Sequence, residues 1–249
     1  MQRIFVKKEQ VNNLKNEIKI IDEEVNHIQN VLRYKVGDKL EIVVDGIIYN
    51  VQIKSMTQDE INCTITNIFE NEQTNKIYLH IIQGLPKADK MELIIQKTVE
   101  LGANEITPLK MERCVVKLDN ETATKKVERW QKIAKSAAQQ SKRNCIPKVN
   151  CIANLQNILE ILKDYDIVII AYEEEKQNTL RKQLEKLKKM NKEAYKIACI
   201  IGPEGGIAPN EIKILLQNNA ICVTLGKRIL RTETAPIMLT SIITYEMES

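Results

Sequence analysis

The chain is 249 residues long, 43% apolar and 4% aromatic, with a formal net charge of +4. This length can bury one large core or two ordinary ones. No apolar run approaches the roughly 20 residues that cross a bilayer, and charged residues follow the first six without a signal-peptide pattern. We therefore expect a soluble, cytoplasmic protein with no membrane partner.

The cysteines argue against a metal or a disulfide framework. Six of them are scattered without a CxxC pair, and the chain has only two histidines. This distribution predicts neither a structural metal nor a disulfide. Cys199 and Cys222 fall inside apolar runs, where we expect small buried thiols.

Residues 1–70 are predicted to form a small β-rich domain. Asp45-Gly46 stands between two apolar runs, which is a strong hairpin signal. The polar stretch 70–75 then suits a linker. The expected elements are a short helix over 23–32 and strands over 39–44, 47–53 and 60–68.

Basic residues are concentrated in the middle of the sequence. Residues 1–75 hold 9 basic and 12 acidic side chains, residues 76–148 hold 15 and 8, and residues 149–249 hold 13 of each. The basic helix face within 125–148 is typical of phosphate contact. A solvated Lys-rich helix explains the same charges equally well.

From residue 77 strands alternate with helices, which predicts a mostly parallel sheet covered on both faces. Gly102 and Asn219 fall at helix C-caps, and Pro209 suits a first helical turn. The expected strands are 77–83, 105–109, 167–171, 197–201 and 221–225, and the expected helices are 89–101, 122–141, 178–190, 209–218 and 232–246.

The strand expected at 197–201 runs into the glycine-rich loop, Gly202-Pro203-Glu204-Gly205-Gly206. Ligands of open α/β sheets bind where strands end in this way. The loop has neither the GxGxxG pattern of dinucleotide folds nor the Lys-Ser/Thr of a Walker A loop, and Glu204 would repel a phosphate. It therefore favours a nucleoside-like ligand that approaches the backbone closely. A plain tight turn is the alternative.

The segment after the last expected strand is basic. Lys227, Arg228 and Arg231 can neutralise a developing anion or hold a phosphate. Thr232 and Glu233 also suit the N-cap and first turn of the following helix. Ile229 and Leu230 are expected to anchor this loop by packing.

Several motifs together resemble the RsmE family, SPOUT-class methyltransferases that modify N3 of a uridine in 16S ribosomal RNA. The resemblance covers nearly the whole chain. It is carried by 225–235 (LGKRILRTETA), the glycine-rich loop, 87–92 (KADKME) with 100–102 (ELG), 112–117 (ERCVVK), 129–134 (RWQKIA), and Arg3 with 27–33.

The resemblance implies an α/β fold: a PUA-like β-barrel RNA-binding domain over 1–70 and a SPOUT domain over 76–249 with a C-terminal trefoil knot. It also implies S-adenosylmethionine bound in the knot, no metal, and a homodimer. Backbone groups and apolar side chains would hold the adenine, with Glu204 meeting the ribose or the ammonium group. The predicted cofactor-binding residues are Ala171, Tyr172, Glu173, Ile201, Gly202, Pro203, Glu204, Gly206, Leu225, Gly226, Ile229, Leu230 and Thr234.

Uracil N3 is protonated at neutral pH, so an enzyme must remove that proton or stabilise the resulting anion. Arg228 and Arg231 are the predicted anion stabilisers, because a guanidinium stays charged, and Glu233 is the candidate base. Trp130 is expected to pack its helix onto the sheet. The predicted RNA contacts are Arg3, Arg33, Lys90, Arg113, Arg129, Lys132 and Arg143.

The expected substrate is a uridine of 16S ribosomal RNA, favoured within an assembled small subunit because the target base must be unstacked. Two other functions stay open. One is a ribosome-assembly factor that binds RNA without catalysis, and the other is a SPOUT enzyme that methylates a ribose 2′-hydroxyl.

Overall fold

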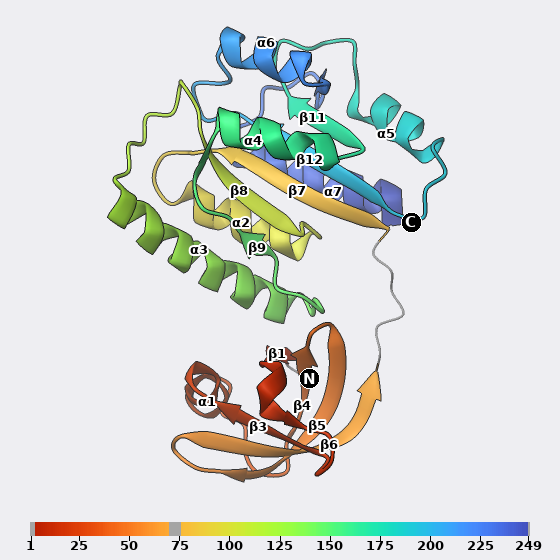
Figure 1. Cartoon of the computed structure of the whole chain (residues 1–249). Helices are drawn as coiled ribbons and strands as arrows, with labels where there is room; N and C mark the ends of the chain where they lie inside the picture. Colours follow the sequence, from red (N-terminus) through yellow and green to blue (C-terminus); the bar gives the residue numbers. More distant parts are fainter. Residues whose placement is uncertain (1–2, 70–75, 249) are drawn as a thin grey trace. The chain divides into compact units, whose positions relative to one another are not determined.

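The computed structural model describes residues 3–69 and 76–248, and the chain divides into two compact units (Figure 1). The first unit comprises residues 1–73 together with 138–146, and the second comprises 74–137 and 147–249. The sequence-based division had assigned 138–146 to the second domain. The predicted linker at 70–75 lies outside the described residues. Within the described ranges, no helix is both long and apolar enough to cross a membrane.

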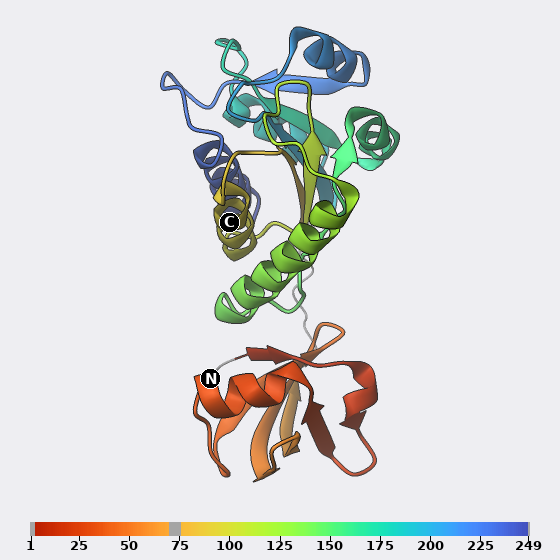
Figure 2. The same ribbon diagram turned by 90° about the vertical axis from the view of Figure 1, so that its left-hand side faces the viewer.

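The first unit is a six-stranded sheet that curls into a half-barrel (Figure 2). Its strand order is β1-β4-β5-β6-β3-β2, with β1 parallel to β4 and the remaining pairs antiparallel. Bulges in the β5–β6 pair help the sheet to curl. The elements are β1 (Arg3–Phe5), η1 (Lys8–Gln10), β2 (Val11–Asn12), β3 (Glu17–Ile21), α1 (Glu23–Asn26), the π-helical η2 (His27–Val31), β4 (Lys39–Val44), β5 (Ile47–Met56) and β6 (Glu60–Phe69).

The predicted hairpin of this unit is confirmed. Val44 pairs with Ile47, and Asp45 and Gly46 between them have φ of 48° and 85°. Two successive positive φ values match the twist of the flanking strands, which is why Asp-Gly is favoured here. The helix predicted over 23–32 is also confirmed as α1 and η2. The core of this unit is filled by alternate residues of its strands, among them Ile4, Ile18 and Ile65.

Residues 138–146 complete the first unit through Arg3. The Arg3 side chain is buried at the start of β1 and forms an ion pair with Glu41, with Nη2 and Oε2 2.9 Å apart. Its guanidinium also donates to the Lys142 carbonyl and the Asn144 side-chain oxygen. The unit is therefore built from two separate pieces of sequence.

The second unit contains the predicted parallel sheet, with strand order β10-β8-β7-β12-β11-β13 and β9 beside β8. Every pair in it is parallel. The elements are β7 (Ile77–Gly84), α2 (Lys90–Glu100), β8 (Glu105–Lys110), α3 (Asn120–Gln140), β9 (Lys148–Val149), β10 (Ala153–Asn154), α4 (Leu155–Ile161), η3 (Leu162–Asp164), β11 (Ile167–Ala171), α5 (Leu180–Lys188), β12 (Tyr195–Ile201), α6 (Pro209–Gln217), β13 (Ala220–Val223) and α7 (Thr234–Glu248).

Helices cover both faces of this sheet, as predicted. In Figure 2 the yellow α2 and the violet α7 lie side by side on one face, and the green α4 lies on the other. Side chains of α4 and α6 form one core cluster with Ile82, Val168 and Ile200 of the strands. The predicted caps are also confirmed, since Gly102 and Asn219 have positive φ and Pro209 begins α6.

Four neighbouring strands end in register at one edge of the sheet. Gln83 pairs with Ile201, Ile201 with Ala171, and Ala171 with Val223. Because the strands are parallel, the loops that follow β7, β12, β11 and β13 leave the sheet at the same carboxyl edge. The last strand ends at Val223, so Leu225, which was expected inside it, belongs to the loop.

Candidate functional site

Two adjoining cavities open at the carboxyl edge, with volumes of about 340 Å³ and 90 Å³. Ala171, Glu173, Ile229, Leu230 and Ala235 line both of them. The larger cavity is also lined by Lys90, Ile201, Gly202, Pro203, Glu204, Gly206, Ile207, Arg231 and Thr232, and the smaller by Tyr172, Thr224, Leu225, Gly226, Lys227 and Arg228.

The structure brings the predicted cofactor-binding residues together. All of them line one cavity or both except Thr234, which is exposed at the start of α7. Sequence reasoning missed four further lining residues: Thr224, Ile207, Ala235 and, as a wall residue, Thr232. A small or apolar residue beside a loop gives no signal that distinguishes a wall from ordinary packing.

The glycine-rich loop is tightly folded, and glycine is required at its first position. A Cβ on Gly202 would lie 2.9 Å from Ile207 Cγ1 and 3.0 Å from the Gly206 carbonyl carbon, so a larger residue would force the backbone apart. Gly206 has φ of 71°, and its N–H donates to the Pro203 carbonyl at 2.9 Å. The loop therefore offers its backbone directly to the larger cavity.

Thr232 connects this loop to the central strand β7. Its hydroxyl donates to the Gly202 carbonyl at 2.7 Å and accepts from Gln83 Nε2 at 3.0 Å. This contradicts its interpretation as an N-cap, because the hydroxyl is engaged with the glycine-rich loop; α7 begins instead with the Thr234 and Ala235 N–H groups donating to the Arg231 carbonyl. The polar Gln83 at the end of an apolar strand was the signal for this link.

Lys90 joins the glycine-rich loop to the base of α7. Its Nζ lies 2.9 Å from Glu204 Oε1 and 3.2 Å from Glu233 Oε2. Its interactions with the Glu204 carboxylate, to which it donates a hydrogen bond, and with the Glu233 carboxylate raise the pKa of Lys90. Burial raises the pKa of Glu204, but the hydrogen bonds that it accepts from Lys90 and from backbone N–H groups, together with the charge of Lys90, outweigh burial, so the pKa of Glu204 lies below its usual value. Glu204 also accepts from the Lys87 N–H at 3.1 Å.

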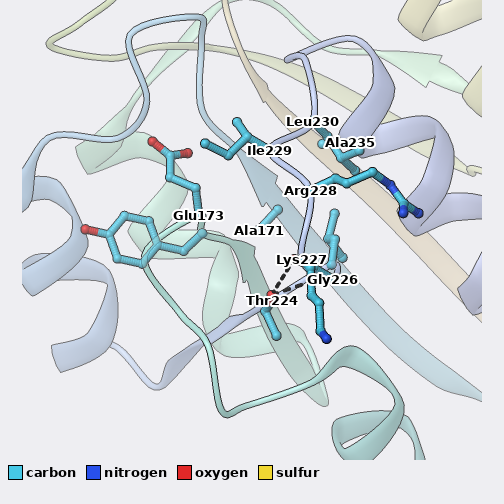
Figure 3. Close-up of a pocket in the computed structure, with 11 residues that line it drawn as sticks. Ala171, Glu173, Thr224, Gly226, Lys227, Arg228, Ile229, Leu230 and Ala235 are labelled. Atoms are coloured by element: carbon cyan, nitrogen blue, oxygen red, sulfur yellow. Dashed lines mark hydrogen bonds between the residues drawn. The ribbon is translucent and has the colours of Figure 1, made fainter.

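The basic loop, defined here as residues 225–231, is held far less firmly. The prediction that Ile229 anchors it is wrong, since Ile229 is 86% exposed, while Leu230 is half-buried. Thr224 and Gly226 form a local turn through bonds of 3.2 Å (Figure 3). Within residues 3–69 and 76–248, neither Arg228 nor Arg231 has a side-chain partner, so both guanidinium groups are available to a ligand.

One carboxylate at the cavities is also available. Glu173 follows β11, lines both cavities and has no side-chain partner among the described residues. Figure 3 shows its carboxylate beside Ile229, with the side chains of Lys227 and Arg228 directed away from it. The neighbouring Tyr172 is half-buried and donates to Glu174 at 2.9 Å.

The predicted RNA contacts of the second unit differ in their surroundings. Lys90 is engaged by two carboxylates, as described above. Arg129 is exposed and forms an ion pair with Glu92, with Nε and Oε1 2.8 Å apart. Arg113 Nη1 donates to the Gly205 carbonyl at 3.1 Å, beside the larger cavity, and Lys132 is exposed on α3.

In the first unit, Arg3 is enclosed by its own partners, whereas Arg33 is exposed and Arg143 is half-buried. Trp130 is 3% exposed, in keeping with its predicted packing role. Cys199 and Cys222 are buried in strands, as predicted. Among the described residues, no group of three His, Cys, Asp or Glu side chains is placed to hold a metal.

Comparison with known proteins identifies the class. A family model described as an RNA methyltransferase domain matches residues 73–244, and one described as an RNA methyltransferase PUA domain matches residues 20–66. The ribosomal RNA small subunit methyltransferase E of Bacillus subtilis (strain 168) is 38% identical over 251 residues, which cover 100% of this chain and 98% of that protein.

Solved structures agree with these matches. A putative methyltransferase from Legionella pneumophila, in complex with its cofactor SAM, is 29% identical with a TM-score of 0.84, covering 98% of this chain and 96% of that one. The ribosomal RNA small subunit methyltransferase E of Neisseria gonorrhoeae, bound to S-adenosylmethionine, is 27% identical with a TM-score of 0.83, covering 98% and 97%. The chain belongs to the ribosomal RNA small subunit methyltransferase E family.

Proposed function

We propose that this protein methylates N3 of a uridine in 16S ribosomal RNA, with S-adenosylmethionine as the methyl donor and the assembled small subunit as the preferred substrate. The observation that carries this proposal is the pair of cavities at the carboxyl edge. They combine apolar walls and glycine backbone with one carboxylate and two guanidinium groups that have no side-chain partner among the described residues. A nucleoside-bearing cation and a developing anion need this combination of groups.

The residues present fit the donor. Gly202 and Gly206 line the larger cavity without side chains, so an adenine can approach the loop backbone closely there. Ile201, Leu225 and Leu230 supply the apolar walls. Glu173 is free to accept from a ribose hydroxyl or an ammonium group, whereas Glu204, the residue first expected there, is engaged by Lys87 and Lys90. When bound, S-adenosylmethionine supplies an electrophilic methyl group on its sulfonium.

The protein must make uracil N3 nucleophilic. Loss of the N3 proton leaves negative charge on O2 and O4, which a guanidinium with paired donors stabilises. We assign this role first to Arg231, because it lines the larger cavity, and second to Arg228, which lines the smaller one. Glu233 remains the candidate base, although its ion pair with Lys90 directs one carboxylate oxygen toward the glycine-rich loop.

RNA contact is proposed for the predicted basic residues whose charge faces solvent. Arg33, Arg129 and Lys132 are exposed, and Arg113 stands beside the larger cavity. Phosphates contribute a salt-dependent share of the affinity, so each exposed cation lost should reduce binding modestly and lower the salt dependence. Arg3 is the weakest of the predicted contacts because its guanidinium is enclosed by Glu41, Lys142 and Asn144.

The knotted C-terminus and the homodimer are also proposals. The knot is supported by the position of α7, which follows the edge strand β13 yet packs against β7 and β12 in the middle of the sheet. A dimer through α2 and α7 is supported by the exposure of Leu93 (42%) and Tyr245 (74%) on these adjacent helices. Stretching single molecules from both ends tests the knot, because a knotted chain stays shorter than its full contour length. Sedimentation tests the dimer.

The function itself is tested by transfer of labelled methyl groups from S-adenosylmethionine to unmodified 30S subunits, with naked 16S RNA in parallel. Mass spectrometry of the nucleosides should detect 3-methyluridine, with more transfer to subunits than to naked RNA. Methyl groups on ribose would instead establish the 2′-hydroxyl chemistry. Tight RNA binding without transfer would establish the RNA-binding assembly factor.

A further inference from the structure

A third cavity of about 140 Å³ lies in the second unit, apart from the two already described. Its walls come from the loop after β7, the first turn of α2, the segment before α3, and α3 itself. The volume exceeds several-fold the roughly 30 Å³ that one water occupies. It is lined by the apolar Leu85, Pro86, Ala88, Met91, Val116, Leu118 and Trp130, and by only two charged residues, Asp89 and Lys126.

Neither of the two charged residues has a side-chain partner among residues 3–69 and 76–248. Asp89 stands at the N-cap of α2 but makes no capping hydrogen bond through its side chain. Lys126 has no ion-pair or hydrogen-bond partner within the described part of the chain, although Lys125 beside it pairs with Glu121 at 2.6 Å. One cavity therefore presents a free acceptor and a free donor between apolar walls, with an aromatic ring among them.

This combination matches the edge and the face of a nucleobase. A base carries N–H donors beside ring acceptors on its edge, and its faces are flat and apolar. A carboxylate accepts from an exocyclic amino group, and an ammonium donates to a ring nitrogen or carbonyl. Stacking against aromatic and apolar side chains is how proteins hold unpaired bases.

The cavity is next to the proposed methyl-transfer site. Asp89 and Met91 line it, while Lys90, the residue between them, lines the larger cavity at the carboxyl edge. The strands that lead to the two cavities, β7 and β12, are neighbours in the sheet. Exposed Lys117 lies between the lining residues Val116 and Leu118, and its positive charge favours a polyanionic ligand.

We propose that this cavity binds an amino-bearing nucleobase (adenine, cytosine or guanine) of the RNA strand next to the methylated uridine. The proposal rests on the proposed function for the identity of the RNA. It assigns Asp89 to the exocyclic amino group and Lys126 to the adjacent acceptor of the same base. The site would hold the strand unstacked while the neighbouring uridine occupies the methyl-transfer site.

Trp130 provides a direct probe, because it is the only tryptophan of the chain and lines the cavity. The protein is titrated with single-stranded RNA pentamers that carry a central uridine flanked by each of the four bases, and Trp130 emission is recorded. Amino-bearing flanking bases should give a saturable change in emission, whereas pentamers of uridine alone should bind at least several-fold more weakly. S-adenosylmethionine alone should leave the emission unchanged.

Variants decide which contacts matter. Asp89→Asn and Lys126→Gln should each weaken binding of the amino-bearing pentamers about tenfold, as expected for loss of a hydrogen bond to a charged group. Lys125→Gln is the matched control, since Lys125 is the neighbouring lysine on the same helix, and it should stay within about twofold because it forms no part of the cavity. Circular dichroism verifies that each variant is folded.

Two outcomes would overturn the proposal. In the first, Asp89→Asn and Lys126→Gln bind every pentamer with the same affinity as the control Lys125→Gln. In the second, a filter assay detects RNA binding but the emission of Trp130 does not change. The methyl-transfer assay on 30S subunits separates this from the proposed function. Transfer to uracil N3 without a Trp130 response would rule out base binding in this cavity and leave the proposed function supported. A base-dependent Trp130 response without methyl transfer would rule out the proposed function and leave base binding in this cavity supported.

Discussion

The two ends of the parallel sheet differ in whether the polar side chains found there include ones without a partner among the described residues. At the amino end, His80 is fully buried, with Nδ1 2.6 Å from the Tyr165 hydroxyl and Nε2 2.7 Å from the Thr107 hydroxyl. Asn150 Nδ2 donates to Thr107 and to Glu105, at 2.7 Å and 2.6 Å. At the carboxyl end, Glu173, Arg228 and Arg231 have no side-chain partner within the described residues.

This difference assigns the polar groups at the amino end of the sheet mainly to stability and the unpartnered ones at the carboxyl end to function. Buried polar groups that satisfy one another add to the folded state and leave nothing for a ligand. Polar groups left without partners at a cavity add little to folding and are available for binding. Substitutions at the amino end should therefore lower stability, and substitutions at the carboxyl end should lower activity.

The largest effect is expected from Arg231→Ala. Removing a donor that stabilises charge developing in the transition state costs about 3–4 kcal/mol, so kcat should fall on the order of 10²–10³-fold while the thermal midpoint stays unchanged. Methyl transfer to 30S subunits at saturating donor measures this. Arg181→Ala, an exposed arginine on α5, is the control. Turnover of the Arg231 variant within a few-fold of wild type would exclude the role, and Arg228→Ala would then be tested in its place.

The amino end predicts a pH effect on stability. Burial lowers the pKa of His80 to about 4, although the nearby Glu105 carboxylate opposes the shift and Lys148 reinforces it. The native state thus holds a neutral imidazole. The stabilisation that the neutral form gives to the folded state is fully present above the unfolded pKa of about 6.5 and is lost as pH falls toward 4. The free energy of unfolding should drop by roughly 3 kcal/mol across this window.

Urea unfolding between pH 7.5 and 4.5 measures this dependence. His80→Gln should be less stable than wild type at pH 7.5 and should show a flatter pH profile between 6.5 and 4.5. His27→Gln, which changes the other histidine of the chain, should retain the wild-type profile. Identical profiles for wild type and His80→Gln would mean that His80 does not carry the effect.

The glycine-rich loop gives the next largest effect. In Gly202→Ala the new methyl would meet Ile207 and the Gly206 backbone at about 3 Å. Such overpacking costs about 1–3 kcal/mol, and the loop that has to shift lines the larger cavity. Calorimetry should therefore show donor affinity weakened roughly 30-fold. Unchanged affinity would mean that the loop backbone does not contact the donor.

The smallest effect concerns Lys90, which ties the glycine-rich loop to Glu233. Lys90→Met should raise the KM for the donor roughly tenfold. Glu204 and Glu233 would lose the cation that they share, and the glycine-rich loop would no longer be held in position. Lys90→Arg should restore most of this loss. Lys97→Met on the same helix removes a comparable ion pair, with Glu100 2.8 Å away, and should leave KM unchanged. An equal rise in KM for both methionine variants would show a general effect of helix charge.

Periodic apolar patterns and turn chemistry were sufficient to predict the long elements of both units. The hairpin at Asp45-Gly46, the strands that became β7, β8, β11 and β12, and the caps at Gly102 and Asn219 all have strong local signals. The two-residue strands β9 and β10 and the seven-residue α4 were missed, because such short segments cannot show a period.

At the site, motifs located the three loops but not the partners of their side chains. Thr232 and Glu233 suited a helix cap locally, yet their contacts are with Gln83 and Lys90, more than 140 residues earlier in the chain. Ile229 was expected to pack because it is apolar, and it is exposed. Long-range pairing and exposure depend on how strands are ordered in the sheet, which no local pattern specifies.

The burial of Arg3 among Glu41, Lys142 and Asn144 has a consequence for synthesis of the protein. A nascent chain emerges from its amino end, but the first strand cannot acquire all its partners until residue 144 has been made. The first unit therefore starts to leave the ribosome before the second, but it is complete only after residues 74–137 of the second unit have also been made. Its maturation has to wait for a segment encoded just after α3, so the two units are synthesised as interleaved pieces and not one after the other.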